Sequence, residues 1–178
     1  KHVIPCANGT DALQIAMMGL DLKPGDEVIT ADFTFAATVE VIALLQLTPV
    51  LVDVDVVNMN ISIEAIKKAI TPKTKAILIC NPNNPTGYLY SESEINQLGE
   101  LVKKHDLFLI ADEVYREFIY DERDQHFSVM NLKGIEQNVI MIDSVSKRYS
   151  MCGARIGCMV TKNREVIAAA MKFAQARL

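Results

Sequence analysis

Apolar positions along the chain form two alternating patterns. Short apolar runs rich in β-branched residues predict strands, and amphipathic stretches between the first five runs predict helices. The strands are expected at Val3–Cys6, Glu27–Ala31, Val50–Asp53, Ala76–Cys80, Phe108–Asp112, Val139–Asp143 and Ile156–Thr161. The helices are expected at Thr10–Leu20, Thr34–Leu47, Ile63–Ile70 and Glu92–His105, with a further helical run over Glu165–Leu178.

The order of these elements predicts the fold class. Near-continuous apolar strands separated by helices indicate a three-layer α/β/α domain with a mostly parallel sheet covered on both faces. Only eleven residues lie between Asp143 and Arg155, which is too few for a parallel crossover. The seventh strand is therefore expected to be antiparallel, with the other six parallel. Ser91 followed by Glu94 predicts a capping box at the start of the helix over 92–105.

Composition and charge indicate which broad class of protein this chain belongs to. A chain of 178 residues, half of them hydrophobic, fits one folded α/β domain. The net charge of −4, without a basic block, gives no indication of nucleic acid binding, and no apolar run or leader pattern indicates a membrane. Cys6, Cys80, Cys152 and Cys158 lack paired spacing, so we interpret them as reduced core thiols of a cytoplasmic protein. The three histidines are scattered, and no metal site is expected.

Two polar segments follow strands, at the edge where open parallel sheets bind ligands. The turn Ala7–Thr10 opens a helix, so its backbone N–H groups suit a phosphate, although an ordinary strand-to-helix turn has the same pattern. The segment Asn81–Gly87, NPNNPTG, places three asparagines and a threonine among two prolines and a glycine. Such a rigid backbone favours a loop that aims side chains, with an ordinary turn as the alternative.

Charged residues follow the next two strands. Asp112 ends an apolar run and precedes Tyr115, so its carboxylate is expected to be partly buried. Burial of that charge is unfavourable unless a cation or donors meet it, and a helix N-cap is the alternative. Ser144, Lys147 and Arg155 follow the sixth strand, where a solvated surface lysine is the alternative for Lys147. Together these groups suit a phosphorylated aromatic aldehyde that forms a Schiff base.

These motifs resemble those of known families. NPNNPTG, DEVY and SVSK followed by GARIG, from about residue 75 to the end, resemble the class I/II aminotransferases of pyridoxal-phosphate fold type I. From about residue 7 to 75, the segments NGTDAL, PGDEVI, FTFAAT and TPVLVDVD resemble the DegT/DnrJ-type sugar aminotransferases. The two resemblances suggest a chimera joined near residues 70–80, with natural divergence as the alternative.

The class I/II resemblance implies a set of roles around pyridoxal 5′-phosphate. Lys147 forms the Schiff base and transfers the substrate proton, Asp112 pairs with the pyridine nitrogen, and Tyr115 assists as the third catalytic residue. Tyr115 and Asn84 bind the ring oxygen, and Phe35 stacks on the ring. The phosphate is assigned to Gly9, Thr10, Ser144 and Arg155.

The resemblance also implies a domain organisation and a set of partners for the chain. Residues 1–178 are expected to form the cofactor-binding large domain, without the N-terminal arm and the C-terminal small domain. The expected partners are a small-molecule amino donor and a keto acceptor, and the expected assembly is a homodimer. A β-lyase, a decarboxylase and a non-catalytic recombined scaffold remain alternatives. The substrate can be an amino acid or an amino sugar.

Overall fold

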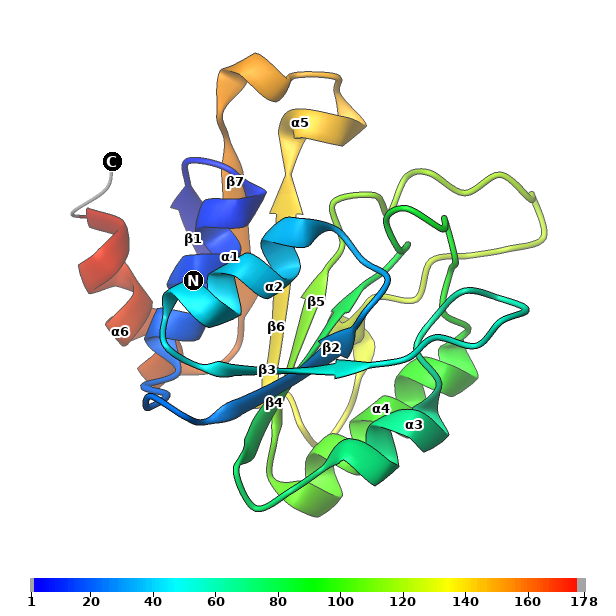
Figure 1. Cartoon of the computed structure of the whole chain (residues 1–178). Helices are drawn as coiled ribbons and strands as arrows, with labels where there is room; N and C mark the ends of the chain where they lie inside the picture. The colour runs from blue at the N-terminus through cyan, green and yellow to red at the C-terminus, as the bar shows by residue number, and fades with distance from the viewer. Residues whose placement is uncertain (1, 176–178) are drawn as a thin grey trace.

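Seven strands form one sheet in the computed structural model, which describes residues 2–175 (Figure 1). They are β1 (Val3–Cys6), β2 (Glu27–Ala31), β3 (Thr48–Val52), β4 (Thr74–Cys80), β5 (Phe108–Asp112), β6 (Val139–Ser144) and β7 (Gly157–Thr161). Their order in the sheet is β1-β7-β6-β5-β4-β2-β3. β7 is antiparallel to both of its neighbours, and the other pairs are parallel. The prediction of six parallel strands and one reversed strand is confirmed.

Six α-helices and two 3-10 turns accompany the strands within residues 2–175, and the last helix follows the last strand. They are α1 (Gly9–Gly19), α2 (Ala36–Leu44), α3 (Ile63–Ala69), α4 (Glu92–His105), α5 (Val145–Arg148) and α6 (Arg164–Gln175), with η1 (Val129–Asn131) and η2 (Cys152–Ala154). α2 is shorter than the expected Thr34–Leu47 at both ends. It begins only after Phe35, whose backbone is extended, and it ends before Gln46, which takes a left-handed conformation with φ of 60°. The last three residues of the expected helix Glu165–Leu178 lie outside the described residues.

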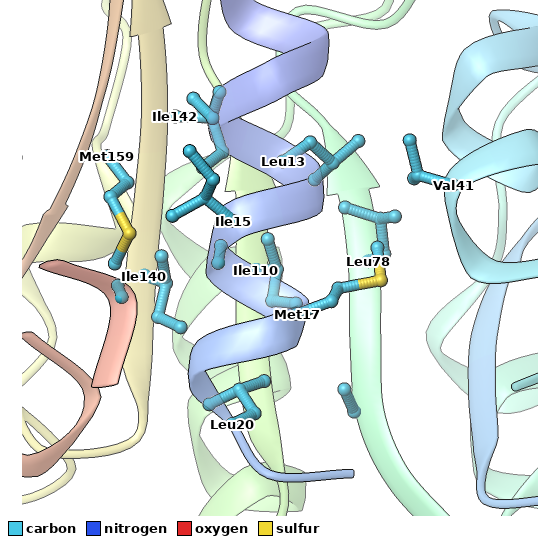
Figure 2. Close-up of a cluster of buried hydrophobic side chains, with 14 of the residues drawn as sticks. Leu13, Ile15, Met17, Leu20, Val41, Leu78, Ile110, Ile140, Ile142 and Met159 are labelled. Carbon is cyan, nitrogen blue, oxygen red and sulfur yellow. The ribbon is translucent and has the colours of Figure 1, made fainter. Parts of the chain in front are cut away.

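Helices cover both faces of the sheet, as the apolar strands predict. α1, α2 and α6 lie on one face, and α3 and α4 lie on the other (Figure 1). Figure 2 shows how α1 builds the first core: Leu13, Ile15 and Met17 project among side chains of the central strands, including Ile110 and Ile140. Burial of an apolar side chain of this size stabilises the fold by about 1.5–3 kcal/mol. This core fixes the N-terminus of α1 above the carboxyl ends of the strands.

The helix α4 closes the second core and has the predicted capping box. Ser91 Oγ accepts from the Glu94 amide at 3.2 Å, while the Glu94 carboxylate accepts from the Ser91 amide at 2.8 Å. Asp106 ends the helix in the left-handed region. These local signals lie at both ends of the segment, which explains why its observed bounds equal the predicted ones.

The alternation of side chains along β5 and β6 determines which face of the sheet each charged residue at the strand ends lies on. Ile110 belongs to the core beneath α1, and Ala111 belongs to the core beneath α4. Because strand side chains alternate with a period of two, Asp112 faces α1 and Glu113 faces the opposite side. The same alternation in β6 places Asp143 on the face away from α1.

Candidate active site

A cavity of about 250 Å³ lies where α1 begins, at the carboxyl ends of β4, β5 and β6. Strands far apart in the sequence bring the polar segments together at this edge. The cavity is lined by all nine residues that the sequence analysis selects: Gly9, Thr10, Phe35, Asn84, Asp112, Tyr115, Ser144, Lys147 and Arg155. The structure thus brings the whole predicted set to one place.

Asp112 supplies a carboxylate at the floor of the cavity. Its Oδ1 accepts from the Val114 amide at 3.2 Å. The pKa of Asp112 is raised to about 6, mainly by burial and to a smaller extent by the nearby charge of Asp143, while the hydrogen bond from the Val114 amide opposes this rise. The alternative of a helix N-cap is wrong, because the residues after Glu113 form turns rather than a helix. No ion pair neutralises this carboxylate within residues 2–175, so a cationic ligand atom fits beside it.

The loop Asn81–Gly87 divides its asparagines between structure and cavity. Asn81 Oδ1 accepts from the Tyr90 amide at 3.1 Å, and Asn83 Nδ2 donates to the Phe33 carbonyl and to Thr86 Oγ1. Asn84 instead faces the cavity, where its Nδ2 donates to Tyr115 Oη at 3.3 Å. The amide and the phenol therefore present adjoining polar groups, and the prediction that this loop aims a side chain agrees with the geometry.

Lys147 projects from the short helix α5. Its Nζ lies 5.8 Å from the centroid of the Tyr115 ring, and it forms no ion pair with another described residue. Ser144 caps α5 by accepting from the Ser146 amide at 3.1 Å, and its hydroxyl donates to the Ile156 carbonyl at 3.0 Å. Ser144 therefore lines the cavity but uses its hydroxyl proton within the protein, which weakens the expectation that it donates to a ligand.

The turn at the start of α1 leaves backbone donors free. Asn8 Oδ1 accepts from the Asp11 amide at 3.0 Å, and the Asn8 carbonyl accepts from the Ala12 amide at 2.9 Å. The amides of Gly9 and Thr10 have no such partner within residues 2–175, and both residues line the cavity. Two free amides at the positive end of an eleven-residue helix form a favourable anion site.

The segment before β7 packs closely against that turn. Arg155 adopts the left-handed conformation, and its Nη1 donates to the Cys152 carbonyl at 3.0 Å while the side chain lines the cavity. A Cβ at Gly157 would lie 2.6 Å from the Asn8 carbonyl oxygen and 2.8 Å from the Gly9 amide nitrogen. Glycine is thus required at 157 for the turn and Arg155 to approach each other. The sequence analysis gave Gly157 no structural role, because this contact joins the two ends of the chain.

Two cysteines also line the cavity, which the sequence analysis did not expect. Cys80 is buried, and Cys152 is exposed and donates from Sγ to the Ser146 carbonyl at 3.3 Å. The interpretation as core thiols is confirmed for Cys6 and Cys80, and it is wrong for Cys152. No sequence signal distinguishes Cys152, because its exposure depends on the path of η2.

A buried acid lies beneath the cavity, on the other face of β5. Glu113 is 0% exposed, and its Oε1 accepts from Ser128 Oγ at 3.0 Å and from the Val129 amide at 2.9 Å. Burial raises the pKa of Glu113 to about 7. Its Oε2 lies 3.7 Å from His126 Nε2, and burial lowers the pKa of His126, so this contact is not an ion pair at neutral pH.

The raised pKa of Glu113 predicts how stability depends on pH. Between its unfolded pKa of 4.5 and its folded pKa of about 7, the folded state binds more protons, so stability falls as pH rises. The shift corresponds to at most about 3 kcal/mol. Asp112 also lowers the stability as the pH rises from 3.8 to about 6. His126, whose pKa is lowered, has the opposite effect: below its usual pKa of 6.5, its contribution makes the stability rise with pH.

Urea unfolding at a series of pH values tests this prediction with Glu113→Gln. Glutamine retains the two hydrogen bonds to Oε1 and cannot ionise. The variant should lose less stability than the wild type between pH 5 and 7.5, and Glu122→Gln, at an exposed position, should follow the wild type. Parallel curves for Glu113→Gln and the wild type would contradict the assignment.

Two general features of the described residues also bear on function. No group of three or more histidine, cysteine, aspartate or glutamate side chains within residues 2–175 could hold a metal ion. None of the helices in the same range has the length and apolar character needed to cross a bilayer.

Comparisons with known proteins agree with the fold. The family model for aminotransferase class I and II matches residues 2–177. The chain is similar to an aspartate aminotransferase of Bacillus subtilis, with 36% identity over 159 residues, 88% of this chain and 40% of the relative. It is also 42% identical over 112 residues to a UDP-2-acetamido-2-deoxy-3-oxo-D-glucuronate aminotransferase of Pseudomonas aeruginosa, covering 63% of this chain and 30% of the relative.

Solved structures of aminotransferases have the same fold as this chain. An aromatic aminotransferase from Pyrococcus horikoshii superposes with a TM-score of 0.92 and 28% identity, over 98% of this chain and 46% of that protein. The three-layer fold with one reversed strand is thus the fold of these enzymes. The chain spans about 40% of the length of the curated aspartate aminotransferase.

Proposed function

We propose, from the premise that this chain belongs to the aminotransferase class I and II family, that it binds pyridoxal 5′-phosphate and supports transfer of an amino group from an amino acid to a keto acid. One observation carries the proposal. An acid, an amide–phenol pair, a lysine, an arginine and a helix N-terminus, which come from several distant segments of the chain, line a single cavity.

The donor set fits the ring of this cofactor. Asp112 is suited to pair with the pyridine nitrogen, because a buried carboxylate without an ion-pair partner gains from an adjacent N–H cation. Such a partner lowers the pKa of a carboxyl by about 1–3 units, and each unit corresponds to about 1.4 kcal/mol. Asn84 and Tyr115 are assigned to the ring oxygen, and Phe35, at the N-cap of α2, is assigned to the ring face.

The phosphate fits the opposite end of the cavity. The free amides of Gly9 and Thr10 and the guanidinium of Arg155 are its proposed donors. A charge-assisted hydrogen bond from Arg155 contributes about 1.5–3 kcal/mol, compared with about 0.3–1 kcal/mol for the helix dipole. Ser144 is assigned a smaller role, because its proton is donated to Ile156. Arg155 should therefore be the main anchor.

The cofactor supplies an electron sink for charge that develops at the substrate α-carbon. The residues of this chain bind the cofactor, position it and transfer the proton. Lys147 would hold the cofactor at its aldehyde; once the substrate amine takes its place there, the freed Nζ would take the proton from the substrate α-carbon and return it during the same half-reaction. Asp112 keeps the ring nitrogen protonated, and Tyr115, whose ring lies beneath Nζ, limits where the lysine can move.

The finer assignments rest on specific features. Phe35 lines the cavity and is exposed, and the exposed apolar residues Phe33, Met151 and Ile156 lie within two positions of cavity-lining residues in the sequence, which supports a homodimer that covers them. Four free thiols support a reducing, cytoplasmic location. A recombined origin stays a hypothesis: one family model spans both parts of the chain, while the Pseudomonas relative supports a link to sugar aminotransferases.

A titration with pyridoxal 5′-phosphate, followed by an amino-donor screen, tests the proposal. The expected result is a saturable visible absorbance band that changes on addition of an amino donor, with release of a keto acid. Release of ammonia or carbon dioxide instead would assign the site to a β-lyase or a decarboxylase. Absence of the band at saturating cofactor would contradict the proposal and favour a non-catalytic scaffold.

A further inference from the structure

Four charged side chains form a network beside the cavity. Asp143 Oδ2 lies 2.9 Å from Arg148 Nη2 and 3.1 Å from Arg116 Nη2. Arg148 Nη2 also donates to Asp143 Oδ1 at 3.1 Å, so one guanidinium nitrogen contacts both carboxylate oxygens. Glu117 Oε1 lies 3.4 Å from Arg148 Nε and 3.7 Å from Arg116 Nε. The side chains of Asp143 and Arg148 are only 13% and 18% exposed, so water screens their contact weakly.

The network joins the two segments that carry the proposed lysine and tyrosine. Arg116 directly follows Tyr115, and Arg148 directly follows Lys147. Through these two arginines, the single carboxylate of Asp143 holds both the turn after β5 and the helix α5. None of the four charged residues lines the cavity, so the network acts from outside it.

The helix α5 depends on contacts of this kind. It has four residues, and an isolated helix of that length is unstable because nucleation is unfavourable. Ser144 fixes its N-terminal end through the Ile156 carbonyl, and Arg148 fixes its C-terminal end through Asp143. Between these two points, Nζ of Lys147 lies over the Tyr115 ring, 5.8 Å from its centroid, and forms no ion pair or hydrogen bond with another residue in the range 2–175.

We infer that Arg148 and Asp143, together with Arg116, are positioning residues that hold Lys147 Nζ over the Tyr115 ring. The inference rests on the proposed function of Lys147. A displacement of about 1 Å at a reacting group can lower a rate by roughly 100-fold. Loosening α5 should therefore slow attachment of the cofactor aldehyde far more than it weakens the fold.

The test uses Arg148→Met, which removes the charged guanidinium and keeps an unbranched apolar side chain in place of its stem. Stopped-flow absorbance with pyridoxal 5′-phosphate should show a visible band that forms about 10-fold to 100-fold more slowly than in the wild type. Without cofactor, amide hydrogen exchange at residues 145–149 should be faster. Arg123→Met is the matched control, because Arg123 pairs with Asp121, outside this network, and its side chain is 88% exposed. It should behave as the wild type does.

Two further variants separate positioning from general stability. Arg148→Lys keeps a cation near Asp143 and should restore part of the lost rate. Asp143→Asn should also slow band formation, because it removes the contacts of Asp143 with both Arg148 and Arg116. The double variant Asp143→Asn/Arg148→Met should be slowed by less than the product of the two single effects, because both changes remove the contact between Asp143 and Arg148. Should Arg148→Met fail to fold, Arg148→Lys and Asp143→Asn make the same comparison.

The outcomes distinguish this inference from the proposed function. Unchanged band formation and unchanged exchange in Arg148→Met overturn the inference and leave the cofactor site standing. No band in the wild type overturns the proposed function, and faster exchange at residues 145–149 in Arg148→Met then still supports anchoring of α5 by Asp143.

Discussion

Replacing Lys147 with alanine will eliminate the visible absorbance band that pyridoxal 5′-phosphate forms with this chain. Alanine has no amine to bond the aldehyde, and no proton acceptor remains for the substrate α-carbon. Positioned acid–base groups contribute about 100-fold to 10,000-fold to catalysis, so a rate measured with an amino donor should fall by at least that range.

Binding of the cofactor should survive in Lys147→Ala, because the phosphate donors at Arg155 and at the start of α1 remain. Equilibrium dialysis will therefore still show saturable binding, without the band. Lys104→Ala is the control, since Lys104 is an exposed lysine in the last turn of α4. A band of wild-type intensity in Lys147→Ala would assign the aldehyde to another amine.

Replacing Asp112 with asparagine should have opposite effects on chemistry and on stability. Asparagine keeps the hydrogen bond from the Val114 amide but cannot pair as an anion with the pyridine nitrogen. The lost interaction corresponds to about 1–3 pKa units, so substrate α-proton abstraction should slow by roughly 10-fold to 1,000-fold. Stopped-flow absorbance with an amino donor measures this step.

The cofactor-free protein should respond in the other direction. The pKa of Asp112 is raised to about 6 from 3.8, so its ionised form destabilises the fold above pH 6, by at most about 3 kcal/mol. Asp112→Asn should therefore be as stable as the wild type near pH 4 and more stable at pH 8. Asp53→Asn, at an exposed position, should change neither property. Slower chemistry combined with lower stability at pH 8 would contradict the account of Asp112.

Local signals in the sequence account for the elements that were predicted best. The helix Glu92–His105 is bounded by a capping box and by a left-handed residue, and both signals lie within a few residues of its ends. The reversed β7 followed from the short connection before Arg155. The order of strands in the sheet could not be predicted, because β2 pairs with β4 and β1 pairs with β7 through contacts between distant segments.

The candidate site was predictable where a residue type and its place after a strand coincide. Asp112 ends an apolar strand, and Asn84, Lys147 and Arg155 come after apolar strands. The rules of open parallel sheets place these residues at one edge. The charge network around Asp143 was not predictable. Its members come from separate segments, and in the sequence they cannot be told from ordinary charged surface residues. The contact of Gly157 with the turn at Asn8 was missed for the same reason.

Peptide mapping after borohydride reduction tests the central claim most directly. The protein is saturated with pyridoxal 5′-phosphate, reduced, digested and analysed by mass spectrometry. The account predicts one modified residue, Lys147, at close to one cofactor per chain. A label on a different lysine, or one spread evenly over the surface lysines, would show that the cavity does not hold the cofactor as described.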